Sequence, residues 1–537
     1  VGSIAAHKNT NVISENFLTY TQKINEDHNL NAMAGYSYQS SRNETWQSNN
    51  RNFISDSFTY WNLGAGSSYQ NAASNMEDWI MSSFYGRVNY NFKGRYLFTV
   101  TGRYDGSSKF GENNKWAFFP SGAFAWNVKE EPFMESVNAI SSLKIRTSYG
   151  ETGNSEIGSY QSLATYSPTL TTMDGVPVNA VRPTSVANPN LTWETTKQTD
   201  AGFDIGFLDN RINLTVDYYY KKTVDLLYAV PLPIYSGFTG ALQNIGSVEN
   251  KGWEFALSTV NLKGDFKWNT DFNITFNRNK ILQLPGGDIF YNTIPGHMLS
   301  TDSQVLREGQ VVGAFYGWQF DGLYQQGDDF SAQPTKKPGD VKYKDIFGRD
   351  ANNELVAGAN GTVNADDRTI IGNPQPDFTF GFNNDFKYKN FDLNIFFQGS
   401  YGNDMLNITR MELDWMAGKA NATKDALRRW TPENTNTDVP RASSTNNAEV
   451  SSRWVEDGSY LRLKNVAFGY TFPTNALSKI SVSQLRLFVS AQNLWTLTNY
   501  TGYDPEVSFQ DSNRNIGLDY MGYPNIKSFT VGINAKF

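Results

Sequence analysis

The chain has 537 residues, of which 15% are aromatic and 18% are charged, and its formal net charge is −7. This weakly acidic balance gives no indication of a nucleic-acid partner, and the absence of cysteine excludes disulfides, thiolate metal sites and cysteine nucleophiles. No apolar run approaches the roughly 20 residues that a membrane-spanning helix needs. Two classes remain: a large soluble β protein and a membrane β-barrel.

Residues that alternate between apolar and polar recur from the start of the chain to its end. Alternation with a period of two predicts a strand with one apolar and one polar face. The polar faces carry Asp, Asn, Thr, Lys and Gln, which suit the wall of a wide, water-filled barrel in lipid better than the inside of a β-sandwich. The predicted strands cover about 12–22, 28–42, 80–92, 95–105, 115–128, 142–152, 196–207, 211–225, 248–262, 266–281, 300–309, 313–325, 377–388, 391–402, 459–472, 485–500 and 528–537.

The last of these strands, 528–537, shows the alternation most clearly. Phe529, Val531 and Phe537 share one face, while Lys536 belongs to the other. We expect the apolar face to contact membrane lipid and the polar face to line the lumen, because the strands of an outer-membrane barrel divide their side chains in this way.

Connections between the predicted strands fall into two classes, short turns and long loops. In outer-membrane barrels the short turns face the periplasm and the long loops face the outside, so the two classes must alternate. Alternation fails only between 266–281 and 313–325, unless a further strand lies near 300–309. With that strand the prediction is an all-β, transmembrane antiparallel barrel of about 17 strands. The alternative is a complete porin without the added strand. The predicted long loops cover about 43–79, 153–195, 326–376, 403–458 and 501–527.

The odd strand count bears on how much of a barrel the chain contains. The final strand descends to the periplasm, and counting back places residue 1 on the extracellular side. A complete bacterial barrel has an even number of strands and both ends in the periplasm. Residues 1–537 are therefore expected to be the C-terminal part of a larger barrel.

A series of motifs points to one family. The chain resembles the SusC/RagA family of TonB-dependent outer-membrane transporters, whose motifs it matches in order. These motifs are SLKIRTSYGETGN (142–154), NPNLTWETTKQTDAGFDIGFLDNRINLTVDYYYKKTVDLL (188–227), NIGSVENKGWEF (244–255), REGQVVGAFYGWQFDGLYQ (307–325), RTIIGNPQPDFTFGFNN (368–384), RWTPENTNTDVPR (429–441) and GYDPEVS (502–508).

This resemblance implies a multi-pass barrel of about 22 strands in the cell outer membrane of a Gram-negative bacterium. It also implies an N-terminal plug domain, a SusD-like surface lipoprotein that acts as a lid, and a TonB complex that pulls on a TonB box. On the strand count above, the plug, the TonB box and the first strands are not in this chain. Beyond the lipoprotein and the TonB complex, the expected surroundings are outer-membrane lipid.

The implied function is TonB-dependent import of oligosaccharides or oligopeptides, with no bond made or broken, so the chain is not expected to be an enzyme. The alternative is a membrane platform that docks secretion or surface-assembly proteins without transport.

Exposed aromatic residues in the extracellular loops are the candidates for ligand binding. Sugar faces stack on Trp and Tyr rings, and peptides use the same rings together with backbone hydrogen bonds. Residues 405–430 also have apolar residues at helical spacing, which predicts a short helix in this large loop, more plausibly packed on the core of the loop than gripping a ligand. The candidate ligand-binding residues are Trp61, Tyr69, Trp193, Tyr235, Trp415, Trp430 and Tyr503.

One loop segment carries a weak metal-binding pattern. Asp350, Asn352 and Glu354 place oxygen-bearing side chains at alternating positions, as calcium loops do, although Leu355 stands where such a loop has glycine. A structural calcium ion is therefore a hypothesis beside the simpler interpretation as a polar loop, and no other cofactor is expected. Glu131 lies in a turn ahead of proline, where we expect it to be solvated.

Overall fold

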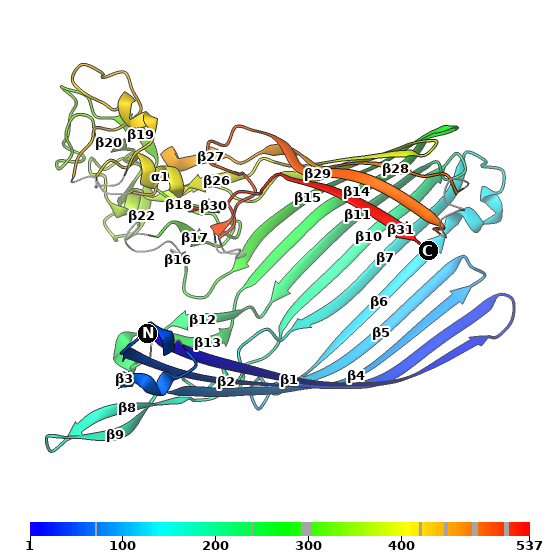
Figure 1. The fold of residues 1–537 in the computed structure, drawn as a ribbon, viewed down its shortest axis with the longest axis horizontal. Helices are drawn as coiled ribbons and strands as arrows, with labels where there is room; N and C mark the ends of the chain where they lie inside the picture. Colours follow the sequence, from blue (N-terminus) through cyan, green and yellow to red (C-terminus); the bar gives the residue numbers. More distant parts are fainter. Residues whose placement is uncertain are drawn as a thin grey trace. The chain divides into compact units, whose positions relative to one another are not determined.

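The computed structural model describes residues 1–58, 60–69, 72–238, 240–291, 302–417, 421–444, 449–474, 482–509 and 515–537. The chain folds into two compact units. The first comprises Val1–Ser136, Lys144–Ala201 and Tyr220–Ser247, and the second comprises Val137–Leu143, Gly202–Tyr219 and Val248–Phe537. Antiparallel strands dominate both units (Figure 1). Within the described residues, no helix has the length and apolarity to cross a membrane.

In the first unit, long antiparallel strands pair in chain order. β1 pairs with β2 from Gly2↔Asn50 to Lys23↔Asn29, and β2 pairs with β4 from His28↔Phe92 onward. The strands are β1 (Gly2–Lys23), β2 (His28–Phe53), β3 (Gly66–Tyr69), β4 (Ala73–Phe92), β5 (Tyr96–Ser107), β6 (Trp116–Asn127), β7 (Ile140–Asn154), β8 (Tyr166–Met173), β9 (Val176–Pro183), β10 (Glu194–Phe207), β11 (Ile212–Val224), β12 (Leu227–Pro231) and β13 (Gly240–Asn244), of which β7, β10 and β11 contribute residues to both units.

Tight turns of the predicted kind join neighbouring strands. Lys93 and Gly94, between β4 and β5, have φ values of 57° and 67°. Positive φ at two successive turn residues is the geometry that matches the twist of a hairpin, and glycine adopts it without steric cost. Within 43–79, which sequence patterns assign to a loop, β2 continues to Phe53 and β4 begins at Ala73.

The expectation that Glu131 is solvated is wrong. Its side chain is 9% exposed. It accepts hydrogen bonds from the Tyr96 hydroxyl at 2.6 Å, Trp126 Nε1 at 3.0 Å and Arg95 Nη1 at 3.2 Å. Tyr96 and Trp126 are directly opposite each other on β5 and β6, so their polar edges meet over the turn that contains Glu131. The Tyr96 hydrogen bond contributes most to lowering the pKa of Glu131, with smaller contributions from Trp126 and Arg95.

In the second unit, β15 pairs with β24 and the remaining long strands continue from there in chain order. The last strand, β31, pairs with β29 from Gln484↔Lys536 to Gln492↔Ser528. Phe529 and Val531 of β31 are 76% and 82% exposed, so the predicted apolar face does point away from the protein. The strands are β14 (Ser247–Lys263), β15 (Phe266–Gln283), β24 (Phe378–Tyr388), β25 (Phe391–Tyr401), β28 (Tyr460–Thr471), β29 (Gln484–Thr498) and β31 (Ser528–Lys536).

Two predicted barrel strands, 300–309 and 313–325, are wrong. β15 pairs directly with β24, from Phe266↔Tyr388 to Thr275↔Thr379, which leaves no place for them in between. The described part of these segments instead contributes to short strands of small sheets. Val305 and Phe315 are both 0% exposed, so these residues belong to the interior of a packed loop. The other predicted strands are present.

The described parts of the long connections of the second unit pack together into what we call the loop assembly, residues 284–291, 302–377, 402–417, 421–444, 449–459, 499–509 and 515–527. A hydrophobic core holds it, formed by Phe315, Leu406, Ile408, Met411, Val450, Trp454 and Leu518. Its elements are β16 (Ile289–Tyr291), β17 (Gln304–Leu306), β18 (Phe315–Gly317), β19 (Phe320–Leu323), β20 (Val341–Tyr343), β21 (Phe347–Arg349), β22 (Leu355–Ala357), β23 (Thr369–Gly372), β26 (Asp404–Asn407), α1 (Ile408–Asp414), β27 (Val455–Asp457) and β30 (Leu518–Asp519).

Candidate functional site

The predicted helix within 405–430 is present as α1, which begins at Ile408 because the preceding residues pair in β26. Asn407 caps it, since its side chain accepts a hydrogen bond from the Arg410 backbone N–H at 2.8 Å. Ile408 and Met411, one turn apart, are buried in the core of the loop assembly. The helix therefore packs on the loop's own core, as the sequence favoured, and its polar side chains border two cavities.

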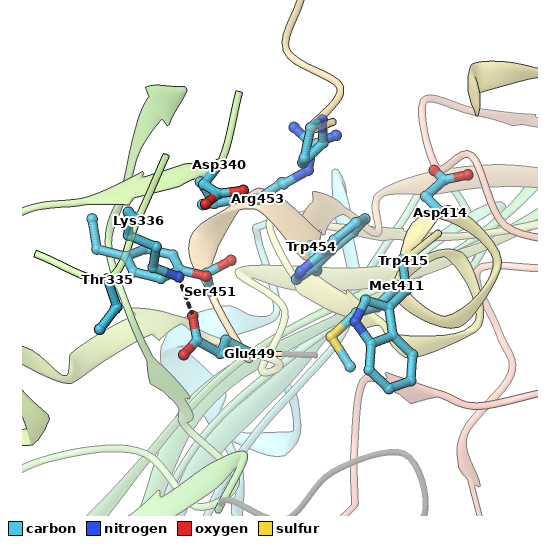
Figure 2. A pocket seen from close by; sticks show the side chains of 13 residues that line it. Thr335, Lys336, Asp340, Met411, Asp414, Trp415, Glu449, Ser451, Arg453 and Trp454 are labelled. Atoms are coloured by element: carbon cyan, nitrogen blue, oxygen red, sulfur yellow. Dashed lines mark ion pairs between the residues drawn. The ribbon is translucent and has the colours of Figure 1, made fainter. Parts of the chain in front are cut away.

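The first of these, which we call the α1 cavity, has a volume of about 280 Å³. Figure 2 shows Lys336 and Glu449 on one side of it and Trp454, Trp415 and Met411 on the other. Lys336 Nζ lies 3.6 Å from Glu449 and 5.5 Å from the centre of the Tyr343 ring. The complete lining is Thr335, Lys336, Asp340, Val341, Tyr343, Met411, Asp414, Trp415, Pro440, Glu449, Ser451, Arg453 and Trp454.

Charged side chains that line the α1 cavity are engaged by partners of opposite charge. Asp340 lies 2.6 Å from Arg441, and Asp414 lies 3.4 Å from Arg410. Together with the Lys336–Glu449 pair, each lining carboxylate thus lies beside a cation, and Arg410 is shared between Asp414 and Glu456. The lining carries three carboxylates, Asp340, Asp414 and Glu449, and two cations, Lys336 and Arg453, beside aromatic rings.

Arg453 is the most deeply buried cation of the cavity, with 4% of its side chain exposed. Its guanidinium lies 5.0 Å from the Trp454 ring and 5.4 Å from the Phe320 ring, and it is 3.7 Å from Asp438. Among the described residues, Nε and Nη2 have no hydrogen-bond partner. Burial lowers the pKa of Arg453, and the two aromatic faces offset part of the cost of burying its charge.

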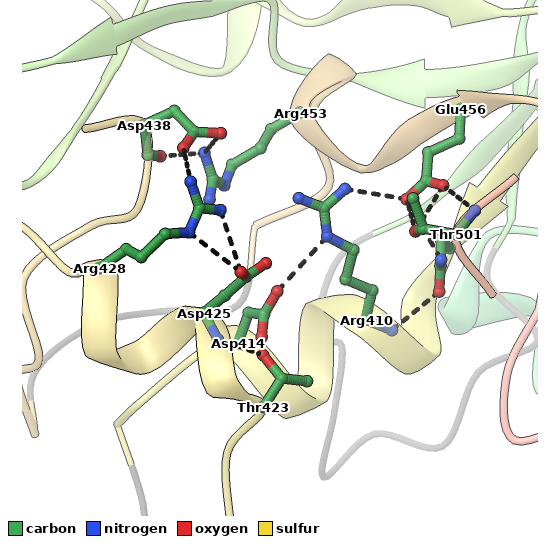
Figure 3. A network of polar contacts seen from close by, with 10 residues as sticks. Arg410, Asp414, Thr423, Asp425, Arg428, Asp438, Arg453, Glu456 and Thr501 are labelled. Carbon is green, nitrogen blue, oxygen red and sulfur yellow. Dashed lines mark hydrogen bonds and ion pairs between the residues drawn. The ribbon is translucent and has the colours of Figure 1, made fainter. Parts of the chain in front are cut away.

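A second cavity of about 550 Å³ lies on the other side of Asp414, and we call it the Tyr503 cavity. Arg410 lines this second cavity and contacts Asp414 at 3.4 Å and Glu456 at 2.9 Å (Figure 3). Thr501 donates its hydroxyl and its backbone N–H to Glu456. Burial opposes ionisation of Glu456, but the hydrogen bonds from Thr501 and Arg410 outweigh it and lower its pKa. This network fixes α1 against both β27 and the loop that carries Tyr503.

Two predicted ligand-binding aromatics lie at these cavities. Trp415 lines the α1 cavity, and Tyr503, which is 74% exposed, lines the Tyr503 cavity. Trp430 is 6% exposed, and its Nε1 donates to Gln325 Oε1 at 2.9 Å. Its ring is therefore built into the loop assembly. The Lys336–Glu449 pair and Arg453, which sequence reasoning missed, join Trp415 at the α1 cavity.

The remaining predicted aromatics belong to the first unit. Trp193 is 3% exposed and packs in a core with Phe110 and Phe119. Trp61 and Tyr235 are 81% and 92% exposed. The backbone of Tyr69 is part of β3, and its side chain lies outside the described part of the structure. Ligand contact by any of these rings stays a prediction.

The predicted calcium residues lie in the turn between β21 and β22. Asp350 Oδ1 accepts hydrogen bonds from the backbone N–H groups of Asn352 and Glu354, both at 2.9 Å. This is the usual way in which an aspartate closes its own turn, and it occupies one of the two carboxylate oxygens. In the described residues no group of three or more His, Cys, Asp or Glu is arranged to hold a metal ion. Calcium binding at this turn stays a prediction.

The family model described as TonB dependent receptor-like, β-barrel matches residues 4–366, more than half of the chain. TonB-dependent receptor P3 of Formosa agariphila is 47% identical over 539 residues, which cover 98% of this chain and 52% of that protein. TonB-dependent receptor SusC of Bacteroides thetaiotaomicron is 32% identical over 472 residues, which cover 85% of this chain and 43% of that protein.

Among solved structures, the RagAB peptide transporter matches with a TM-score of 0.84 and 28% identity, over 99% of this chain and 56% of that one. The chain thus spans about half the length of the curated relatives that it matches.

Proposed function

Because the chain belongs to the TonB-dependent receptor-like β-barrel family and resembles its SusC and RagA members, we propose that it supplies the wall and extracellular loops of an outer-membrane importer. The family is one of receptors and transporters rather than enzymes. In this proposal the chain binds and passes its cargo in the outer membrane of a Gram-negative bacterium without changing a covalent bond.

The cargo that we propose is an oligosaccharide or an oligopeptide. The observation that carries this part is the loop assembly, in which two cavities border one helix: the α1 cavity is lined by several aromatic rings and the Tyr503 cavity by one, and both have charged hydrogen-bonding groups. Sites for small organic ligands combine apolar and aromatic walls with a few placed polar groups in this way. SusC and the RagAB peptide transporter, to which the chain is similar, support the same class of function.

Polar side chains on the strands suit a water-filled path below the loops. On β24 and β25, the Asn394 amide donates to Asn383 at 2.7 Å and to Asp385 at 3.0 Å. The polar side chains of such a row hydrogen-bond to one another and still offer acceptor atoms to water, as the lumen of a barrel requires. Ligand released from the loops would move along surfaces of this kind.

The proposed partners are a SusD-like surface lipoprotein that covers the loops and the TonB complex, acting through a plug and a TonB box. The lipoprotein holds the ligand against the loop assembly, and the pull of TonB on the plug opens the path.

Purification of the whole receptor from native outer membranes in mild detergent tests this function. We expect a surface lipoprotein to co-purify and mass spectrometry to detect a bound glycan or peptide. Uptake of that ligand by cells should then depend on the receptor gene. A stable complex with secretion or surface-assembly proteins, without ligand and without loss of uptake on deletion, would show that the barrel is a docking platform instead.

A further inference from the structure

We propose that the Tyr503 cavity binds a carboxylate group of the imported ligand and that Lys424 is the cation that pairs with it. This inference rests on the proposed import function and deepens it, because it gives the ligand a charge and assigns the contact to a named residue. The carboxylate belongs either to a sugar acid or to an amino acid, and matched probes separate these two sources.

Lys424 is a cation that lacks a partner of opposite charge. It belongs to the short 3₁₀ helix Lys424–Arg428, is exposed, and lines the Tyr503 cavity. Its ammonium group makes no hydrogen bond or ion pair with any other residue that the structure describes. An ammonium has three N–H donors and no acceptor, so a negatively charged acceptor is the partner that suits it.

Contacts on both sides hold the backbone of Lys424 in place. The Thr423 hydroxyl donates to Asp414 on α1 and accepts the Asp425 backbone N–H at 3.2 Å (Figure 3). Asp425 in turn lies 3.0 Å from Arg428, at the end of the same short helix. The segment that carries Lys424 is therefore anchored to the wall of the cavity, and only the lysine side chain has to be ordered when a ligand binds.

The lining of the Tyr503 cavity has more cations than carboxylates. Its cations are Arg410, Lys424 and Arg428, and its carboxylates are Asp414 and Asp425. Each carboxylate lies beside an arginine, at 3.4 Å for Asp414 and at 3.0 Å for Asp425. The charge of Lys424 is thus left without a counter-charge in the lining, and a single negative charge on a ligand supplies one.

Glu456 is a further carboxylate next to this lining, and hydrogen-bond donors of the protein surround it. It accepts from Arg410 Nη1 at 2.9 Å, from the Asn407 amide at 3.2 Å, and from the hydroxyl and the backbone N–H of Thr501 at 2.7 and 2.8 Å. Its side chain is only 10% exposed. Although Arg410 is shared with Asp414, Glu456 is therefore stabilised by four donors, and Lys424 remains available to a ligand.

Arg453, in the α1 cavity, adds a second positive charge that is incompletely paired. Its Nε and Nη2 have no hydrogen-bond partner among the described residues, and Asp438, 3.7 Å away, is shared with Arg428 at 3.9 Å. Because only 4% of its side chain is exposed, Arg453 acts on an incoming ligand through its charge rather than by contact. Since Asp414 lines both cavities, the two cations favour an anion on the same side of the loop assembly.

The size and walls of the Tyr503 cavity suit a small unit that carries one carboxylate. Its volume of about 550 Å³ falls within the roughly 300–1,000 Å³ of sites for small organic ligands. Leu413 and the exposed ring of Tyr503 provide apolar surface for the rest of the unit. A carboxylate has one negative charge for the one free ammonium, whereas a phosphate, with a charge of about −2, would leave negative charge unpaired beside Asp414 and Asp425.

Saturation-transfer NMR on the whole receptor in detergent tests the proposal with two matched pairs of probes. Glucuronate is compared with glucuronamide, and N-acetylalanine with N-acetylalaninamide, so that the members of each pair differ by one negative charge. We expect at least one carboxylate to bind about fivefold more tightly than its amide, which is the upper range for an exposed ion pair, and that pair identifies the source. High salt should reduce the preference, because it screens exposed charges.

Substitutions at Lys424 assign the preference to this residue. Lys424→Gln should abolish it and Lys424→Arg should retain it, because only the arginine keeps the positive charge. Lys344→Gln is the control, because Lys344 is another exposed lysine of the loop assembly and does not line the Tyr503 cavity. Heat-modifiable mobility of the barrel in gel electrophoresis confirms that each variant is folded.

Several results would overturn the proposal. Neither carboxylate binds more tightly than its amide, the preference persists in Lys424→Gln, it is also lost in Lys344→Gln, or glucose 6-phosphate binds more tightly than glucuronate. Uptake of the native ligand, measured in parallel, separates this proposal from the import function. Uptake without a carboxylate preference refutes only the Lys424 site, whereas a carboxylate preference without uptake supports the site and refutes import.

Discussion

Removal of the Asp504 carboxylate should release the loop that follows β29 from the barrel wall. Arg462, the third residue of β28, is 3% exposed and lies 2.6 Å from Asp504, which is 4% exposed. Asp504 Oδ2 also accepts the backbone N–H of Asn525 at 2.9 Å, so one carboxylate joins the wall to both ends of the loop. Glu506 contacts the same guanidinium, which leaves Arg462 partly paired when Asp504 is lost.

The expected magnitude follows from these contacts. Breaking a buried ion pair by removing one partner costs about 3–5 kcal/mol, and the hydrogen bond to Asn525 contributes about 1 kcal/mol. Because Glu506 remains beside Arg462, we expect Asp504→Ala to lower the local opening free energy by about 3 kcal/mol. At 1.4 kcal/mol for each factor of ten, the amides of this loop should exchange roughly 100-fold faster.

Hydrogen exchange followed by mass spectrometry, on the receptor in detergent, measures this directly. Asp377→Ala is the matched control, because Asp377 pairs with Arg278 at 3.0 Å but is 60% exposed, where a pair contributes at most about 1 kcal/mol. Unchanged exchange of Asn525 and its neighbours in Asp504→Ala, or an equal effect of Asp377→Ala, would refute the reasoning.

The same contact predicts a dependence on pH. Burial alone would raise the pKa of Asp504, but the hydrogen bonds from Arg462 and from backbone N–H groups outweigh it and lower the pKa below its usual value. A group whose pKa is lower in the folded state stabilises that state above its unfolded pKa of about 3.9, and this contribution is lost as the pH falls through the folded value. Loop exchange in the wild type should therefore accelerate only in acid, and Asp504→Ala should remove this acid dependence.

Three further predictions concern the other buried and exposed groups. Glu131→Gln should speed the exchange of backbone amide hydrogens in the turn after β6, because the neutral glutamine side chain cannot form an ion pair with the guanidinium of Arg95. An exchange rate equal to that of the wild type would contradict the role assigned to Glu131. Trp193→Ala should destabilise the first unit by about 3–5 kcal/mol, while Trp61→Ala should be nearly neutral, and thermal denaturation of the two variants compares a core ring with an exposed one. Calorimetry on chelator-treated receptor tests calcium: binding heat that disappears in Asp350→Ala supports the site, and absence of heat in the wild type removes it.

Local features of the chain were enough to predict most strands and turns. The alternation in 528–537 and the turn at Lys93 and Gly94 depend only on neighbouring residues, because a strand that separates lipid from water must alternate and a tight hairpin turn needs positive φ. Motif order was likewise a property of the sequence, and the family it indicated, SusC/RagA, is confirmed.

Segment 300–325 shows where local pattern fails. Val305 and Phe315 are fully buried because residues from other loops cover them, and Trp318 donates its backbone N–H to Val450 at 2.9 Å. The strand at 300–309 was added only so that short turns and long loops would alternate, and a buried apolar run such as that within 313–325 has the same composition in a loop core as in a strand.

The cavities were decided by tertiary structure alone. Trp193 and Trp61 look alike as loop aromatics, and only the packing of distant residues makes one of them core and leaves the other exposed. Arg441 and Asp340 are 101 residues apart in the chain and 2.6 Å apart in space. The sequence by itself determined most of the strands, the tight turns and the family, because these follow from interactions between neighbours and from motif order. Which charges are paired, and which rings face a cavity, depended on loop closure over long separations, which no local pattern encodes.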